Sequence, residues 1–370
     1  MSYTFVAPCY FGTESVAGFE IRRLGAENVE VSDGRIRFEG GVDLIAAANI
    51  NVRSVERVMM LLASYKAVTF DELFDGVYAI PWEELLPADA AFPVKGSSLS
   101  STLSSVPACQ SIVKKAIVKR LQKGHGVNTL PESGSQYQVR VSLRKDVAEI
   151  FLDTSGDGLH KRGYRRNANA APLKETLAAT IADLGRIRQF SQMYDPFCGS
   201  GTLVIEAAQK ALNMAPGLRR RFAAEKYGFV PAESWQKARS EALAAIRREN
   251  VEFQGFGSDI DPAAIALAEK NARLAGVAEY CHFEVADVRN FAPPEDAIVL
   301  SNPPYGERLG DLSEAAAVEK ALGKQLKEHP VKGAYIITAD AGFEQNFGKK
   351  ANRRRKLYNG MIPCQVYMYY

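Results

Sequence analysis

The hexapeptide Ser-Asn-Pro-Pro-Tyr-Gly at residues 301–306 has residue types suited to chemistry at an exocyclic amine of a nucleic-acid base. Such an amine is a poor nucleophile because its lone pair is delocalised into the ring. The Asn302 side-chain oxygen and the Pro303 carbonyl can accept hydrogen bonds from its two N–H groups and so draw the lone pair out of the ring plane. Pro303 and Pro304 stiffen the loop, and Tyr305 offers a ring on which a base can stack.

This hexapeptide follows a short apolar run, 297–300, which predicts a buried strand. Ligands in open α/β sheets bind at the carboxyl ends of strands, where this loop would lie. A proline-rich turn that merely ends a strand is the alternative interpretation. The hexapeptide alone does not distinguish a base-binding loop from such a turn, and the other motifs of the chain decide between them.

A glycine-rich segment, Asp195–Thr202, lies between a predicted strand at 190–194 and a predicted helix at 203–212. A strand, a glycine turn and a helix N-terminus together form a nucleotide-type site, and Gly199 and Gly201 allow close approach to the backbone. Neither the dinucleotide fingerprint G-x-G-x-x-G nor a P-loop is present. An ordinary tight turn between strand and helix is the alternative.

Acidic residues follow the next two predicted strands, 253–258 and 281–285. Asp259 can accept both hydroxyls of a ribose, and Asp287 can accept an adenine amino group. Asp261 is better explained as the cap of a helix over 262–275. Either acid taken alone could be a cap or a solvated charge, so the order of all four motifs carries the argument.

The ordered set resembles the class I S-adenosylmethionine-dependent methyltransferases that methylate exocyclic amines, over residues 165–370. The resemblance implies a catalytic set of Asn302, Pro303, Pro304 and Tyr305. It implies a cofactor site of Asp195, Pro196, Phe197, Cys198, Gly199, Gly201, Thr202, Asp259, Ile260, Asp287 and Asn302. An insertion at 213–250 departs from a minimal βαβ unit, so the assignment of Asp259 depends on the resemblance rather than on spacing.

The first half predicts an α+β region. We expect strands at 4–7, 36–38, 61–65 and 77–80, helices at 13–24 and 42–49, a lysine-bearing amphipathic helix at 112–121 and a hairpin over 137–152. The serine-rich stretch 97–105 is typical of a linker. From residue 97 to 160 the chain resembles a THUMP domain, an RNA-binding appendage of RNA-modifying enzymes, preceded by a ferredoxin-like subdomain.

As a whole, the chain resembles the bacterial guanine-N2 methyltransferases of large-subunit (23S) ribosomal RNA, in a short form that lacks a second methyltransferase domain. In that group, the segment matching 173–176 lies beside the methionine end of the cofactor, which adds Leu173 and Thr176 to the site. The resemblance implies a ferredoxin-like subdomain at 1–65, a THUMP-like domain at 66–160 and a Rossmann-like α/β methyltransferase domain with a mostly parallel seven-stranded sheet at 161–370.

Basic clusters lie at 160–166, 219–221 and 353–356. Such clusters can position nucleic acid through its phosphates, although a run of charge is often only a solvated face. We favour a role in nucleic-acid binding for the first and third clusters, and the sequence favours neither interpretation for the second. The residues expected to contact RNA are Lys114, Lys115, Lys119, Lys161, Arg162, Arg165, Arg353 and Arg354.

The composition fits a cytoplasmic protein. The net charge is only +3, so overall charge does not by itself indicate a nucleic-acid binder. The five cysteines have no paired or metal-ligand spacing, and the sequence has neither a signal peptide nor an apolar run of membrane-spanning length. We therefore expect no disulfide, no metal and no membrane contact.

The motifs favour direct methyl transfer from S-adenosylmethionine to a flipped base, with neither a covalent nucleophile nor a metal. A DNA adenine-N6 methyltransferase would use the same Asn302 chemistry, and the N-terminal half argues against it. Transfer RNA is an alternative to ribosomal RNA that the sequence leaves open. A non-catalytic RNA-binding assembly protein is a rival of another class, but it would not require Asn302.

Overall fold

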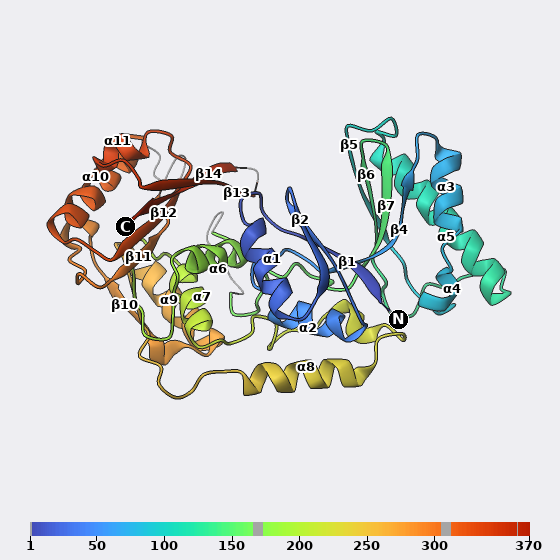
Figure 1. Ribbon diagram of the computed structural model, residues 1–370, viewed down its shortest axis with the longest axis horizontal. Helices are drawn as coiled ribbons and strands as arrows, with labels where there is room; N and C mark the ends of the chain where they lie inside the picture. The colour runs from blue at the N-terminus through green and yellow to red at the C-terminus, as the bar shows by residue number, and fades with distance from the viewer. Residues whose placement is uncertain (1, 166–172, 305–311, 361) are drawn as a thin grey trace.

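The computed structural model describes residues 2–165, 173–304, 312–360 and 362–370. The predicted stacking residue, Tyr305, lies outside the described residues. Two seven-stranded sheets organise the chain. They occupy opposite sides of the molecule in Figure 1, with the N-terminal half on the right and the C-terminal half on the left.

The N-terminal sheet has the order β2-β3-β1-β4-β7-β6-β5. Its strands are β1 (Tyr3–Pro8), β2 (Glu27–Ser32), β3 (Arg35–Gly40), β4 (Met59–Lys66), β5 (Val94–Leu99), β6 (Val139–Arg144) and β7 (Val147–Asp153). Only β5 and β6 pair in parallel, and the other neighbours are antiparallel. Because β4 pairs with both β1 and β7, one sheet and one hydrophobic core run through the whole N-terminal half.

Five helices accompany this sheet: α1 (Glu14–Arg23), α2 (Asp43–Asn51), α3 (Phe70–Tyr78), α4 (Trp82–Leu85) and α5 (Val106–His125). The strand expected at 77–80 is wrong, because Val77 and Tyr78 end α3. Thr69 and Glu72 form a capping box that starts this helix, and Val77 is fully buried. The T-x-x-E signal is visible in the sequence. The serine-rich stretch is only partly a linker, since β5 contains its first residues.

The C-terminal sheet has the order β10-β9-β8-β11-β12-β14-β13. Its strands are β8 (Gln192–Asp195), β9 (Gln254–Asp259), β10 (Cys281–Val285), β11 (Ile298–Ser301), β12 (Gly333–Thr338), β13 (Arg353–Asn359) and β14 (Ile362–Tyr369). The first five in this order are parallel, and β14 and β13 add an antiparallel hairpin. The expected α/β class with a mostly parallel seven-stranded sheet is confirmed. The described parts of the four ordered motifs lie at the carboxyl ends of β8, β9, β10 and β11.

The helices of this half are α6 (Glu175–Leu184), α7 (Thr202–Ala211), α8 (Ala232–Ala244), α9 (Pro262–Ala275), α10 (Leu312–Glu328) and α11 (Phe343–Phe347). The insertion at 213–250 contains α8, which crosses to the N-terminal half along the lower side of Figure 1 and packs on α2. There, the Ser234 hydroxyl donates a hydrogen bond to Asp43. None of the helices in the described ranges is both long and apolar enough to cross a membrane.

Buried charges join the two halves. The Arg53 guanidinium donates to the main-chain carbonyls of Gln209 and Met214. Arg162 donates to the Arg53 carbonyl at 2.6 Å, and its Nε lies 3.5 Å from the carboxylate of the fully buried Glu206. Breaking one member of such a group would leave an uncompensated buried charge, so this network fixes how the halves sit against each other.

Candidate active site at the carboxyl edge of the sheet

The glycine-rich segment forms the turn between β8 and α7. Gly199 and Gly201 both have left-handed backbone conformations, with φ of +50° and +77°. A Cβ at residue 201 would meet Ala268 and Phe283 at 3.0 Å, whereas one at residue 199 would face open space. Gly201 thus lets the turn pack closely on its neighbours, and Gly199 leaves an uncovered stretch of backbone that a ligand can approach.

Asp259 lies directly beside this turn. One of its carboxylate oxygens accepts the Gly199 main-chain N–H at 3.0 Å, and the other accepts that of Asp261 at 3.0 Å. The insertion therefore lengthens the chain between glycines and acid without separating them. Ile260, the next residue, is 68% exposed. A large apolar side chain exposed beside a glycine turn and a carboxylate suits a ligand with both a flat ring and hydroxyl groups.

Asp195 fastens the end of β8 to the end of β11. It is 2% exposed and accepts hydrogen bonds from the Ser301 hydroxyl at 2.6 Å and the Phe197 main-chain N–H at 3.1 Å. Burial raises the pKa of Asp195 to about 7, despite the opposing effect of the Ser301 hydrogen bond. The sequence analysis gave Ser301 no role of its own, although it precedes Asn302 and donates to Asp195, the acid of the glycine-rich segment.

Asn302 follows this contact directly. Its side-chain oxygen is buried and has no hydrogen-bond partner among the described residues. An unsatisfied buried acceptor costs about 1–3 kcal/mol, and such groups are rare in native structures. A bound donor would satisfy it. Pro303 beside it is buried and Pro304 is half-buried. This loop thus offers a preformed acceptor at the place where ligands bind in open α/β sheets.

Arg165 was expected to contact RNA, and the structure corrects this. Its side chain is 7% exposed and pairs with Glu175 at 3.0 Å. The same guanidinium donates to the Leu173 carbonyl at 3.0 Å and to the Thr202 hydroxyl at 3.1 Å. Arg165 therefore joins two segments predicted to line the cofactor site and has little surface left for a phosphate. The sequence placed it in a basic run, which concealed this role.

Arg162 is a second correction. It is 4% exposed and its donors are directed to main-chain carbonyls of Leu159 and Arg53. Three other residues that were expected to contact RNA form ion pairs within the protein: Lys114 pairs with Glu132, Lys161 with Asp157 and Arg354 with Glu344. Lys115, Lys119 and Arg353 are exposed, and their contact with RNA stays a prediction.

Asp287 lies at the start of a short turn after β10. Its carboxylate accepts the Arg289 main-chain N–H at 2.8 Å and pairs with the Arg289 guanidinium at 2.8 Å. These contacts lower the pKa of Asp287, with the main-chain hydrogen bond as the largest cause. The carboxylate is therefore ionised at neutral pH and can accept a hydrogen bond from an amino group. Its Oδ1 also accepts the Arg289 Nε–H at 3.0 Å, whereas Oδ2 contacts only one guanidinium nitrogen and keeps a lone pair for such a donor.

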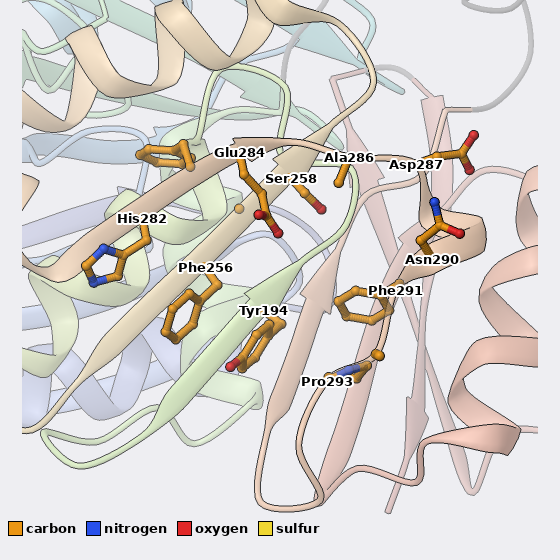
Figure 2. Close-up of a pocket in the computed structure, with 13 residues that line it drawn as sticks. Tyr194, Phe256, Ser258, His282, Glu284, Ala286, Asp287, Asn290, Phe291 and Pro293 are labelled. Carbon is orange, nitrogen blue, oxygen red and sulfur yellow. The ribbon is translucent and has the colours of Figure 1, made fainter.

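A cavity of about 550 Å³ adjoins Asp287 on the face of the sheet (Figure 2). Three rings from neighbouring strands form its floor: Tyr194 stacks on Phe256 at 4.6 Å, and Phe256 on His282 at 5.1 Å. Asp287 and Ser258 lie at its upper end in Figure 2, toward the carboxyl edge. The cavity therefore extends from the predicted adenine acid along the sheet.

Cys198 is buried in the glycine turn. Burial, reinforced by the nearby Asp195 and Asp259 carboxylates, raises the pKa of its thiol far above the ordinary value. A thiol is nucleophilic only as the thiolate. The side chain therefore fills space in the turn, which agrees with leaving it out of the chemistry. Leu173 and Thr176 are also buried, and the Thr176 hydroxyl donates to Glu56 of the N-terminal half at 2.5 Å.

Comparison with protein families gives three matches in chain order. Residues 4–59 match the RlmL ferredoxin-like domain, 67–153 the THUMP domain, and 162–368 the RMKL-like methyltransferase domain. The chain belongs to the RMKL-like methyltransferase family. This membership confirms the resemblance to THUMP-bearing class I methyltransferases and the expected S-adenosylmethionine cofactor. The boundaries after residues 65 and 160 stay predictions.

Two relatives and one solved structure match this chain along almost its whole length. This chain is 41% identical over 371 residues to YpsC of Bacillus subtilis, which is named as a candidate RNA methyltransferase. The match covers 100% of this chain and 96% of YpsC. It is 34% identical to the ribosomal RNA large subunit methyltransferase K/L of Psychromonas ingrahamii, covering 99% of this chain but 50% of that protein. The structure of SMU.472, a candidate methyltransferase complexed with SAH, is 38% identical, with a TM-score of 0.93 over 100% of this chain and 98% of that one.

The domain set and these relatives together support an S-adenosylmethionine-dependent RNA methyltransferase. The residues present fit that cofactor. Gly199 leaves open backbone, Asp259 lies beside it, and Ile260 exposes an apolar side chain. The individual cofactor and catalytic residues stay predictions, and Tyr305 cannot be placed because it lies outside the described ranges.

Proposed function

We propose that the protein methylates N2 of a guanine in 23S ribosomal RNA, by direct transfer to a base flipped out of its helix. The proposal depends mainly on the side-chain oxygen of Asn302 at the carboxyl end of β11, which is buried and has no hydrogen-bond partner within the described ranges. A guanine amino group supplies the donor that this oxygen lacks. The choice of large-subunit RNA follows the name of the Psychromonas relative, half of which this chain matches.

The bound cofactor would supply a methyl group on a positively charged sulfur, and the protein's residues would position the acceptor. The Asn302 side-chain oxygen and the Pro303 carbonyl would accept hydrogen bonds from the two N–H groups of the amine, so that its lone pair faces the methyl carbon. As the new N–C bond forms, the methyl–sulfur bond breaks, and the amine releases one proton to solvent. Asp195 holds the Asn302 loop in place through Ser301. Catalysis in this scheme comes from positioning and exclusion of water.

Asp259 would bind the ribose hydroxyls and Asp287 the adenine amino group. Both proposals rest on acceptor position: the first carboxylate contacts the glycine turn, and the second borders the cavity beyond it. Leu173 and Thr176 would lie beside the methionine end. The contacts of Arg165 with Leu173 and Thr202 support this, because they place that segment against the start of α7.

The test is methyl transfer from labelled S-adenosylmethionine to unmodified 23S ribosomal RNA, followed by nucleoside analysis. We expect N2-methylguanosine. Unmodified transfer RNA and DNA serve as parallel substrates, so that label in N2-methylguanosine of transfer RNA, or in N6-methyladenosine of DNA, would replace the proposal by a named alternative. The absence of label in every substrate would favour a non-catalytic RNA-binding protein.

A further inference from the structure

Two aromatic side chains from opposite halves of the molecule meet at the surface. Phe11, in the loop between β1 and α1, is 51% exposed, and its ring lies edge-on to that of Tyr358 in β13, with centroids 5.9 Å apart. The far end of the Phe11 ring rests on the turn at Gly34, where a Cβ would be only 3.3 Å away. The pair is thus held in place from below, while much of the Phe11 ring remains open to solvent.

The loop that carries Phe11 is docked tightly on β13. Gly12 has φ of +85°, and a Cβ there would lie 2.2 Å from the Lys356 carbonyl oxygen. Arg355 donates to the Gly12 carbonyl at 3.1 Å and lies 3.3 Å from the Ser15 hydroxyl. Because main chain meets main chain here, the position of Phe11 relative to the methyltransferase half is fixed.

Strand register places this pair at the active-site end of the sheet. Ser301, at the end of β11, pairs with Ile336 of β12, and β12 ends at Thr338 opposite Gln365. Tyr358 pairs with Pro363, which lies two residues before Gln365 in the antiparallel strand β14 and therefore beyond the end of β12. The β13–β14 hairpin therefore projects beyond the carboxyl edge, past the level at which Asn302 begins. In Figure 1 the hairpin approaches α1 of the N-terminal half.

A chain of contacts also runs from the predicted cofactor segment to Phe11. Thr176 donates to Glu56, and the Lys174 ammonium lies 3.7 Å from the same carboxylate. That ammonium also lies 5.5 Å from the ring centre of Tyr10, the residue before Phe11. Phe11 is therefore connected to the start of α6, next to Leu173, as well as to the hairpin.

Cations accompany the rings. Lys356 is exposed and lies on the same face of β13 as Tyr358, two residues away, and Lys174 is about one-third exposed. Exposed rings beside cations are the combination used for single-stranded nucleic acid, with bases stacked and phosphates neutralised. A protein partner of neutral surface would have no use for this charge.

We propose that Phe11 and Tyr358 form a stacking site for an unpaired base of the RNA next to the methylated nucleotide. The inference rests on the proposed function, and it gives the ferredoxin-like part a direct role in holding substrate. A base flipped toward Asn302 leaves its neighbours unstacked. A fixed ring pair at the rim of the site provides one neighbour with a new stacking partner. Phe11 is thereby a positioning residue, which touches RNA but not the reacting atoms.

Tryptophan fluorescence tests the stacking directly. The chain has two tryptophans, Trp82 and Trp235, and they are 0% and 5% exposed. Phe11→Trp therefore adds the only exposed indole, and we expect unmodified 23S ribosomal RNA to quench it in the presence of S-adenosylhomocysteine. The matched control is Phe190→Trp. Phe190 is 62% exposed, but it precedes β8 and therefore lies at the amino ends of the parallel strands, away from the active site. Equal quenching of both variants, or of neither, would overturn the proposal and leave the pair as a contact between domains.

Kinetics separate this proposal from the proposed function. Phe11→Ala should raise KM for the same RNA by about 10- to 100-fold, the loss expected for one base–aromatic stack. Phe11→Trp should restore it, and Phe190→Ala should leave it unchanged. If wild-type protein transfers methyl groups and Phe11→Ala has normal KM, the stacking site is wrong. If wild type transfers none, yet Phe11→Trp alone is quenched, the stacking site stands and the proposed function fails.

Discussion

At the scale of single residues, the Asp259 carboxylate is the group whose role in cofactor binding can be tested most directly. It holds the glycine turn through Gly199, and we propose that it binds ribose. Asp259→Ala should weaken binding of S-adenosylhomocysteine by about 1.5–3 kcal/mol, because a charged acceptor is lost. Asp261→Ala is the control: it removes the α9 cap, which should cost stability of about 1 kcal/mol and little affinity. Calorimetric titration that gave equal affinities for wild type and Asp259→Ala would remove Asp259 from the site.

Asp195 should make stability depend on pH. Its pKa is about 7 in the folded protein and near 3.8 when unfolded, because burial opposes its ionisation. The folded state therefore holds a proton that the unfolded state has released between these values. The contribution of Asp195 to stability is complete below about pH 4 and is lost as pH rises through 7.

Asp195→Asn removes this titration, so the stability of wild type relative to the variant should fall between pH 4 and 7. Urea unfolding at several pH values measures the difference. Glu319, whose pKa burial also raises to about 7, titrates in both proteins and cancels from the comparison. A constant difference across the range would show that Asp195 is not held protonated.

The residue types of the site could be predicted from the sequence, because glycines at a turn and acids after strands are local patterns. The hydrogen-bond and ion-pair partners of these residues could not be predicted. Ser301 hydrogen-bonds to an acid 106 residues away, and Arg165 turns inward to Glu175 although it lies in a basic run. Both depend on which strands become neighbours and on burial, and neither of these is written in local spacing.

At the scale of elements, the Phe11 loop makes a close main-chain contact with β13 that joins the two halves. Gly12→Ala must adopt φ near +85° and also place a methyl group on the Lys356 carbonyl. Gly25→Ala is a matched control, with φ of +79° and nothing within 4 Å of the added carbon. The control should lose roughly 1–2 kcal/mol from backbone strain alone.

Gly12→Ala should lose more than the control and should increase protease cleavage between the halves. Denaturant unfolding and limited proteolysis measure the two effects. Equal losses in both variants would mean that the loop does not need its close contact with β13.

Elements with a clear period were predicted well. The helix at 262–275 and the strand at 281–285 have the expected bounds. The strand expected at 77–80 failed because four apolar-rich residues fit either a strand or the end of a helix, and the capping box upstream decides for the helix. The joining of both N-terminal parts into one sheet through β4 rests on pairings between distant strands, which the sequence does not display.

At the scale of the whole molecule, charge distribution rather than net charge should govern RNA binding. Lys115 and Lys119 are exposed on α5, at the far right of Figure 1. Replacing both with Ala should weaken RNA binding and reduce its salt dependence, because fewer counterions are released. Lys324 and Lys327 on α10 are exposed at the opposite end and form the control pair.

The same net charge is removed in both double variants, so a difference between them isolates position. Filter binding to 23S ribosomal RNA over a salt series provides the slopes. If both pairs changed affinity alike, RNA binding would reflect overall charge and not the N-terminal module.

The central claim is that Asn302 accepts the target amine. Its measurement is methyl transfer to unmodified 23S ribosomal RNA by wild type and Asn302→Ala, beside calorimetric binding of S-adenosylhomocysteine to each. The account predicts N2-methylguanosine from wild type, loss of transfer by the variant, and retained cofactor binding, because we propose that the Asn302 oxygen, which has no partner among the described residues, binds the target amine and not the cofactor. Near-normal turnover by Asn302→Ala, with cofactor binding intact, would contradict the account.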